Sequence, residues 1–339
     1  MISIGRRIKK QFISSSHDKV TCHDSLVDLL TNIKVQGYTF ITVTPRTHEH
    51  FLSRANVKGK NLSDIFGWNL PFSIDALCPM LRRIMVDANI IEPSGDLLRS
   101  KLRISSLGGD LFLHSAFPTN EHDAVFFGPD TYRFARFIRH ILENDERLFS
   151  EKNKKFQRPF RILDIGCGTG AGGIAAVRAL PQGRSYELSM NDISATALDL
   201  TRVNARVAGV PINCMEGDIF AAINEKFDLI VANPPYISDM SGRAYRDGGA
   251  HLGLDLSIRI FKTALEHLVP GGQLILYTGV AMTSQLDPFL STITPLLAAV
   301  ACTWSYEEID PDIFGEELEM PAYANAHRIA AVGLVVTRL

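Results

Sequence analysis

One glycine-rich stretch constrains this chain more than any other part of it. Residues 161–173 read RILDIGCGTGAGG, so apolar residues of strand type run directly into a loop with five glycines. A buried strand needs such apolar residues, and the loop after it needs glycine wherever a ligand lies against bare backbone. The stretch therefore predicts a buried strand followed by a ligand-binding loop.

Strand-like and helix-like segments alternate from this point on. RILDI precedes GIAAVRAL, YELSMND precedes ATALDLTRVNARVAG, and FDLIVAN and GGQLILYTG follow later with a helical segment between them. Such alternation predicts an α/β fold, in which helices cover both faces of a parallel sheet and ligands bind at the carboxyl ends of the strands.

The residue before the loop indicates which ligand binds there. The loop itself nearly satisfies the GxGxxG pattern of dinucleotide-binding proteins, but that pattern alone is weak. Asp164 places an anion where a pyrophosphate would be repelled and a cationic amino group would be attracted. S-adenosylmethionine fits this position, because it carries an ammonium and a sulfonium group and no phosphate.

Two further acids follow the next strands. Asp192, in YELSMNDIS, is placed to accept both hydrogen bonds of a ribose diol, or alternatively to cap the helix that starts near Ser194. Asp218, in CMEGDIF, is placed to accept from an adenine amino group, or alternatively is a turn residue. Together with Asp164, these acids favour an adenosine-containing cofactor.

The segment FDLIVANPPYI carries the chemistry. Its two successive prolines exclude both helix and strand pairing, and so fix a rigid turn. A nitrogen to be methylated needs acceptors that hold its N–H groups and expose its lone pair. The side-chain oxygen of Asn233 and the carbonyl of Pro234 supply such acceptors, and Tyr236 is placed to stack on a planar group.

These motifs carry a family resemblance over about residues 124–279. DIGCGTG, NDIS, GDIF and NPPYI, in this order, resemble the class I S-adenosylmethionine-dependent methyltransferases. IVANPPYI and the segment after it are similar to the release-factor glutamine methyltransferases and their relatives with a small methyltransferase domain. The resemblance implies a Rossmann-like, mostly parallel sheet, whose last two strands form an antiparallel hairpin at one edge.

The resemblance also implies residue roles, matched motif by motif. The catalytic residues would be Asn233, Pro234 and Tyr236. The cofactor-binding residues would be Asp164, Gly166, Gly168, Gly170, Asp192, Ile193, Asp218, Ile219 and Asn233, with Phe127, Pro129 and Thr131 from the FFGPDTY loop. The chain departs from the family where LYTG replaces an acidic strand end, and in its N-terminal third, so the resemblance does not give the methyl acceptor.

We expect three parts: a basic, flexible leader at 1–20, an accessory domain at 21–122 and the methyltransferase domain at 123–339. In the accessory domain the patterns predict helices over 24–33, 61–68 and 73–91, a strand over 38–44, and a hairpin that turns at Gly108 and Gly109. Helix, helix, hairpin is a winged-helix-like α+β order. The hairpin would then display Arg99, Lys101 and Arg103 on one side, as a nucleic-acid contact or as a solvated strand face.

Composition narrows the partners. Residues 1–125 carry 15 Lys and Arg against 12 Asp and Glu, and residues 126–339 carry 20 against 25, so the charge balance does not predict a nucleic-acid partner.

Five dispersed cysteines fit reduced thiols in a cytoplasm, and no apolar run reaches the roughly 20 residues of a membrane span. The histidines form no ligand set, so no metal is expected. The acidic segment 307–319 would face a basic protein or solvent.

We therefore expect an N-methyltransferase for a planar amide or amino nitrogen, most naturally a protein glutamine-type amide or a nitrogen of a small metabolite. An exocyclic amino group of a nucleobase in RNA or DNA is the first alternative. A cofactor-binding module without catalysis is the second. The oligomeric state is left open by the sequence.

Overall fold

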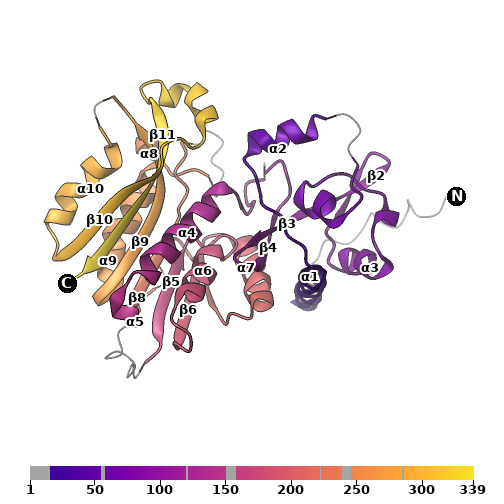
Figure 1. The fold of residues 1–339 in the computed structure, drawn as a ribbon, viewed down its shortest axis with the longest axis horizontal. Helices are drawn as coiled ribbons and strands as arrows, with labels where there is room; N and C mark the ends of the chain where they lie inside the picture. The colour runs from indigo at the N-terminus through magenta and orange to yellow at the C-terminus, as the bar shows by residue number, and fades with distance from the viewer. Residues whose placement is uncertain are drawn as a thin grey trace.

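The computed structural model describes residues 16–54, 58–119, 121–149, 158–221, 223–238, 246–284 and 286–339. It places a larger α/β part beside a smaller N-terminal part, with the colours from indigo to dark magenta marking the N-terminal elements (Figure 1). Most of the expected leader lies outside the described residues, and its last five positions belong to the first helix. None of the described helices is both long and apolar enough to cross a bilayer.

A seven-stranded sheet forms the centre of the α/β part, in the order β10-β11-β9-β8-β5-β6-β7. Its strands are β5 (Phe160–Ile165), β6 (Tyr186–Asp192), β7 (Asn213–Glu216), β8 (Phe227–Ala232), β9 (Leu268–Met282), β10 (Cys302–Asp310) and β11 (Arg328–Arg338). Strands β5 to β9 pair in parallel, and β11 is antiparallel to both β9 and β10. The predicted Rossmann-like sheet with an antiparallel edge hairpin is confirmed.

Successive residues of each central strand point to opposite faces of the sheet, and each face has its own hydrophobic core. Ile162 and Val231 pack on one face, beneath helices α4 and α6, while Leu163 and Ile230 pack on the other, beneath α9 and α10. Both faces are therefore buried, as a parallel sheet requires. The helices of this part are α4 (Pro129–Glu143), α5 (Glu146–Phe149), α6 (Ala171–Ala179), α7 (Ala195–Ala208), α8 (Ala250–Gly253), α9 (Asp255–His267) and α10 (Pro288–Ala298), with short 3-10 turns at Gly315–Glu319 and Pro321–Tyr323.

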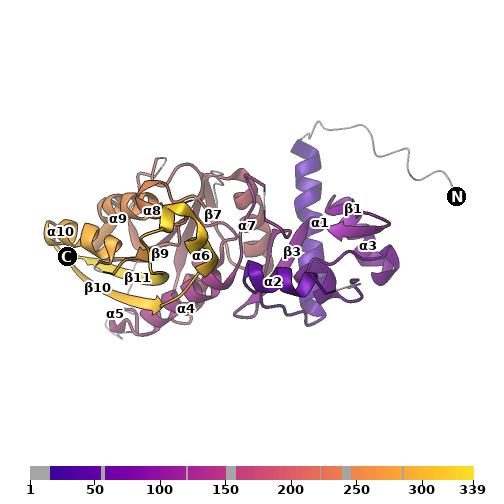
Figure 2. The same cartoon turned by 90° about the horizontal axis from the view of Figure 1, so that it is seen from above.

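The N-terminal part consists of helices and two hairpins, seen from above in Figure 2. Helix α1 is longer than predicted, and Pro79 starts a new helix inside the segment predicted to be one helix, because proline fits the first turn of a helix and not its interior. The elements are α1 (Ser16–Val35), α2 (Pro45–Leu52), a π-helical turn (Ser63–Gly67), a 3-10 turn (Ile74–Ala76), α3 (Pro79–Asp87), β1 (Ile91–Ser94), β2 (Leu97–Ser100), β3 (Leu102–Leu107) and β4 (Asp110–Ser115).

The strand predicted over 38–44 is wrong. Its alternating residues are buried as predicted, but it meets β3 through a backbone hydrogen bond from the Ser106 amide to the Phe40 carbonyl (2.9 Å) and does not form a ladder. Side chains accept from its own amides: the Phe40 amide donates to Ser106 Oγ (3.1 Å), and the Thr42 amide donates to the Tyr132 hydroxyl (3.0 Å). Helix α2, which was not predicted, follows at once, with Thr44 as its N-cap and Pro45 in its first turn. A period-2 pattern indicates alternating burial and does not show what pairs with the backbone.

The predicted hairpin turn at Gly108 and Gly109 is confirmed, but the hairpin β3–β4 is not a free wing. It packs on α7, where Asn204 exchanges hydrogen bonds with the backbone of Leu113 (2.8 and 3.2 Å). The expected basic face does not form either, because Arg103 is buried and donates to the carbonyl of Gly67 (2.9 Å). The N-terminal part is therefore docked firmly on the α/β part.

Two buried histidines lie in the N-terminal part. His48 stacks on Phe117 and bonds the carbonyl of Trp68 (2.9 Å), and His114 bonds Ser105 Oγ (2.8 Å). Burial and the positive charge of Arg103 lower the pKa of His48 to about 4 and the pKa of His114 well below its ordinary value. Both side chains are therefore neutral in the fold at neutral pH.

We expect the free energy of unfolding to fall as pH drops below about 6.5. In that range the histidines are protonated in the unfolded chain and neutral in the folded protein. The free energy of unfolding therefore falls by about 1.4 kcal/mol per pH unit for each histidine, until the pH reaches the pKa of that histidine in the folded state. Denaturant titrations at pH 7.5, 6.5 and 5.5 would measure the slope. His48→Gln should flatten it and His50→Gln, at an exposed position on the same helix, should not. Equal slopes in both variants would contradict the prediction.

Candidate active site

The loop after β5 is built by glycines in a left-handed conformation. Gly166, Gly168 and Gly170 have φ values of 64°, 55° and 79°, which residues with a side chain rarely adopt. A Cβ at Gly166 or Gly168 would meet no atom within 4 Å, so these two glycines border open space. A Cβ at Gly170 would lie 3.0 Å from Thr201 of α7, so this glycine allows helix α6 to start against α7.

Asp164 lies at the end of β5, beneath this loop. Its carboxylate is buried and accepts a hydrogen bond from the amide of Gly173 (2.7 Å). Burial raises the pKa of Asp164 to about 7, with the Gly173 hydrogen bond opposing the shift and the nearby Asp192 adding to it. A buried carboxyl group of this kind is stabilised in its charged form by a cationic ligand.

The two other predicted acids lie nearby, at the ends of β6 and beyond β7. Asp192 accepts from the amides of Gly168 (2.8 Å) and Ser194 (2.9 Å), and Ser194 itself caps α7. Asp192 therefore fixes the glycine loop, and the alternative of a capping role belongs to Ser194. Asp218 is half-exposed and paired with Arg259 of α9 (2.8 Å).

A cavity of about 180 Å³ joins these residues. Among the described residues, four aspartates line it and no lysine, arginine or histidine does. Such a set of carboxylates fits a cationic, adenosine-containing cofactor and does not fit a pyrophosphate. The predicted residues on its wall are Thr131, Asp164, Gly166, Gly168, Asp192, Ile193, Asp218, Ile219, Asn233 and Pro234.

A second cavity, of about 260 Å³, meets the first at Phe126 and residues 233–235, which line both. Its other walls come from parts of the chain far apart in sequence. The N-terminal part supplies Glu49 of α2 and Phe117, and the connection from β10 to β11 supplies Phe314. A molecule in one cavity and a molecule in the other would therefore meet at the Asn-Pro-Pro turn.

Asn233 holds an unused acceptor at this junction. Its Oδ1 atom is shielded from solvent and accepts no hydrogen bond from any residue that the structure describes. Leaving a buried acceptor unsatisfied costs about 1–3 kcal/mol, so such an atom calls for an explanation. An N–H donor that enters the second cavity would satisfy it.

Comparison with known proteins agrees with this geometry. Residues 147–293 match the family model "Methyltransferase small domain". This region of the chain is similar to a methyltransferase small domain. It is a class I, S-adenosylmethionine-dependent methyltransferase fold, as the motifs predicted.

The names of two relatives of the methyltransferase domain give different methyl acceptors. The chain is 34% identical over 178 residues to "Release factor glutamine methyltransferase" of Deinococcus radiodurans, which covers 49% of this chain and 59% of that protein. It is 33% identical over 140 residues to "Ribosomal RNA small subunit methyltransferase C" of Sodalis glossinidius, covering 41% of this chain and 35% of that protein. The chain thus spans less than two thirds of either relative.

One solved structure with a similar fold is a ribosomal protein L11 methylase from Lactobacillus delbrueckii subsp. bulgaricus. The TM-score is 0.37 at 18% identity, and the match covers 60% of this chain and 78% of that chain.

Three residues that were predicted to bind the cofactor do not line the first cavity. Phe127 is buried and stacks against the rings of Phe112 and His114, Pro129 opens α4, and Gly170 lies against α7. Phe126, next to Phe127, lines both cavities instead. Thr131 is on the wall, and its hydroxyl accepts from the amide of Gly128 (3.2 Å).

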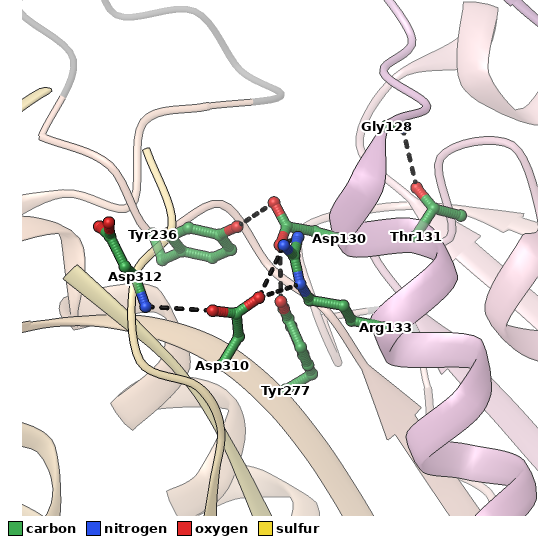
Figure 3. A network of polar contacts seen from close by, with 8 residues as sticks. All are labelled: Gly128, Asp130, Thr131, Arg133, Tyr236, Tyr277, Asp310 and Asp312. Carbon is green, nitrogen blue, oxygen red and sulfur yellow. Dashed lines mark hydrogen bonds and ion pairs between the residues drawn. The ribbon is translucent and has the colours of Figure 1, made fainter. Parts of the chain in front are cut away.

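Tyr236 lies on the acceptor side only. Its ring borders the second cavity, and its hydroxyl donates to the buried Asp130 of α4 (2.7 Å), as Figure 3 shows. The hydroxyl therefore points into the protein, and only the ring is available to an acceptor.

The acidic segment 307–319 belongs partly to this site. Asp310 pairs with Arg133 of α4 (2.8 Å), Glu317 pairs with Arg246, and Phe314 lines the second cavity. The segment as a whole is therefore neither a free solvated loop nor simply a surface for a basic partner, because part of it forms one wall of the acceptor cavity.

Proposed function

We propose that this protein transfers a methyl group from S-adenosylmethionine to a planar amide or amino nitrogen. The unsatisfied Oδ1 of Asn233, at the junction of the two cavities, carries this proposal. An acceptor atom in that position favours a methyl acceptor that brings a hydrogen-bond donor, as the N–H groups of an amide or amino nitrogen do.

The mechanism needs alignment above all. The bound cofactor supplies an activated methyl group on its sulfonium. Asn233 Oδ1 and the Pro234 carbonyl accept the two N–H groups of the target, so that its lone pair turns toward the cofactor cavity. The Tyr236 ring and Phe126 hold the planar group in place, and the four aspartates of the first cavity retain the cationic cofactor.

A glutamine-type side-chain amide of a protein, or a nitrogen of a small metabolite, is the acceptor that we favour. The second cavity has mainly apolar and aromatic walls, and its only described charged groups are Glu49, Asp130 and Arg246. The last two are paired within the protein. A polynucleotide would need unpaired cations for its phosphates. Of the three basic residues expected to contact one, Arg103 is buried, Arg99 is half-buried, and Lys101 is exposed but donates to the carbonyl of Asn89 (3.0 Å).

A nucleobase amino group is the second candidate. The observation that favours it is the similarity to an rRNA small subunit methyltransferase, at an identity close to that of the release-factor relative. A base flipped out of its strand is also a planar group with an N–H donor.

Incubation of the purified protein with methyl-labelled cofactor and cell extract would decide between these acceptors. We expect label in macromolecules that protease releases and nuclease does not, or in the small-molecule fraction. Release by nuclease would favour the nucleobase. Absence of label from every fraction, with the cofactor still bound, would overturn catalysis and favour a binding module.

A further inference from the structure

Asp130 is the centre of a buried polar network beside the acceptor cavity. Its side chain is about 3% exposed. Oδ2 accepts from the hydroxyl of Tyr236 (2.7 Å), and Oδ1 accepts from the hydroxyl of Tyr277 (2.6 Å) and from Nη1 of Arg133 (3.1 Å). These donors come from the turn after β8, from β9 and from α4, so one carboxylate joins three elements (Figure 3).

The two tyrosine hydroxyls can only donate to Asp130, because both stay protonated. Burial, followed by the negative charge of Asp130, raises the phenol pKa of Tyr236 and of Tyr277 far above the neutral range, so both hydroxyls keep their protons. Arg133 also pairs with Asp310 of β10 (2.8 Å). A carboxylate has enough lone pairs for all three hydrogen bonds, so the network is fully satisfied.

The backbone of the catalytic turn is packed closely around Tyr236. A Cβ at Gly279 of β9 would lie 2.4 Å from the Tyr236 ring, and a Cβ at Gly253 would lie 2.2 Å from the Tyr236 carbonyl oxygen. Glycine at these positions lets the turn sit directly on its neighbours. The ring lies against Gly279, the backbone of Tyr236 lies against Gly253, and the bond to Asp130 anchors the hydroxyl end of the ring.

Resting on the proposed role of Asn233, we infer that Asp130 is a positioning residue for methyl transfer, which acts by holding Tyr236. Tyr236 is three residues from Asn233 in a turn stiffened by two prolines. A displacement of the ring is therefore passed to the Asn233 oxygen and the Pro234 carbonyl. Misplacement of a reacting group by about 1 Å can cost on the order of 100-fold in rate.

Two matched variants test the inference, because each removes one hydroxyl from the same carboxylate. Tyr236→Phe frees the catalytic turn, and we expect the labelling rate at saturating cofactor to fall at least tenfold. Tyr277→Phe frees only β9, and we expect at most a threefold loss. Asp130→Asn should match Tyr236→Phe, because its amide cannot accept from both tyrosines. Cofactor affinity, measured by calorimetry, should stay within threefold of wild type in all three, since Asp130 does not line the cofactor cavity.

The double variant Asp130→Asn/Tyr236→Phe tests whether Asp130 acts on methyl transfer through Tyr236. If Asp130 acts through Tyr236, the double variant is no slower than the slower single variant. Multiplying losses, or equal losses in Tyr236→Phe and Tyr277→Phe, would overturn the inference while leaving the proposed function intact.

Amide hydrogen exchange gives a readout that needs no acceptor. We expect the amides of Tyr236 and Ile237 to exchange faster in Asp130→Asn and in Tyr236→Phe than in Tyr277→Phe. Unchanged exchange in the first two variants would overturn the inference even if wild type labels nothing. Absence of labelling by wild type, with the expected exchange pattern, would instead count against the proposed function alone.

Discussion

Replacing Asn233 by alanine is expected to lower the rate of methyl transfer by about 100- to 1,000-fold, the usual effect of removing one preorganised hydrogen-bonding group from a catalytic site. The variant loses the only buried acceptor at the junction that the described protein leaves unsatisfied. Because that acceptor costs stability in the free protein, the variant should be as stable as wild type or slightly more so.

Asn233→Asp is the matched control. It keeps an acceptor oxygen at nearly the same place, so we expect it to transfer label at least tenfold faster than Asn233→Ala. Cofactor affinity should change little in either variant, because most of the cofactor wall is made by other residues. An alanine variant as active as wild type would refute the assigned role of Asn233, and a parallel loss of cofactor binding would move that role to the cofactor.

The α/β part of this fold was predictable because its signals are local. The strand and glycine loop at 160–170 follow from residue type alone, since positive φ at Gly166, Gly168 and Gly170 needs glycine. The acids at the ends of β5 and β6 and just after β7 were also visible, because strand ends are marked by a change of composition. Their convergence on one cavity then follows from the parallel sheet.

The acceptor side was less predictable, because distant segments form it. Phe126 and Phe127 are adjacent and chemically identical, yet only Phe126 reaches the cavities, and no pattern in FFGPDTY distinguishes them. The pair of Arg133 with Asp310 spans 177 residues. The TP dipeptide at Thr44 and Pro45, in contrast, was a usable start signal for α2, which supplies part of the cavity wall.

Replacing Asp164 by asparagine is expected to weaken S-adenosylmethionine binding by about 10- to 100-fold, since a charge-assisted hydrogen bond contributes roughly 1.5–3 kcal/mol. Asparagine keeps an oxygen for the amide of Gly173, so the loop should stay folded. Adenosine, which lacks the amino-acid end, is the control ligand: its affinity should be nearly equal in the two proteins. Equal loss for both ligands would mean that the variant damages the pocket as a whole.

The same residue predicts a pH dependence with a definite sign. With its pKa raised to about 7 by burial, Asp164 is mostly ionised at pH 7.5 and mostly protonated at pH 6. A protonated acid attracts a cation weakly, so the affinity of wild type for S-adenosylmethionine should fall by about tenfold between these pH values. Calorimetry at pH 7.5, 6.75 and 6 would measure it. Asp164→Asn cannot titrate there and should show a much flatter profile, whereas parallel profiles would place the titrating group elsewhere, with Asp192 the nearest candidate because burial also raises its pKa.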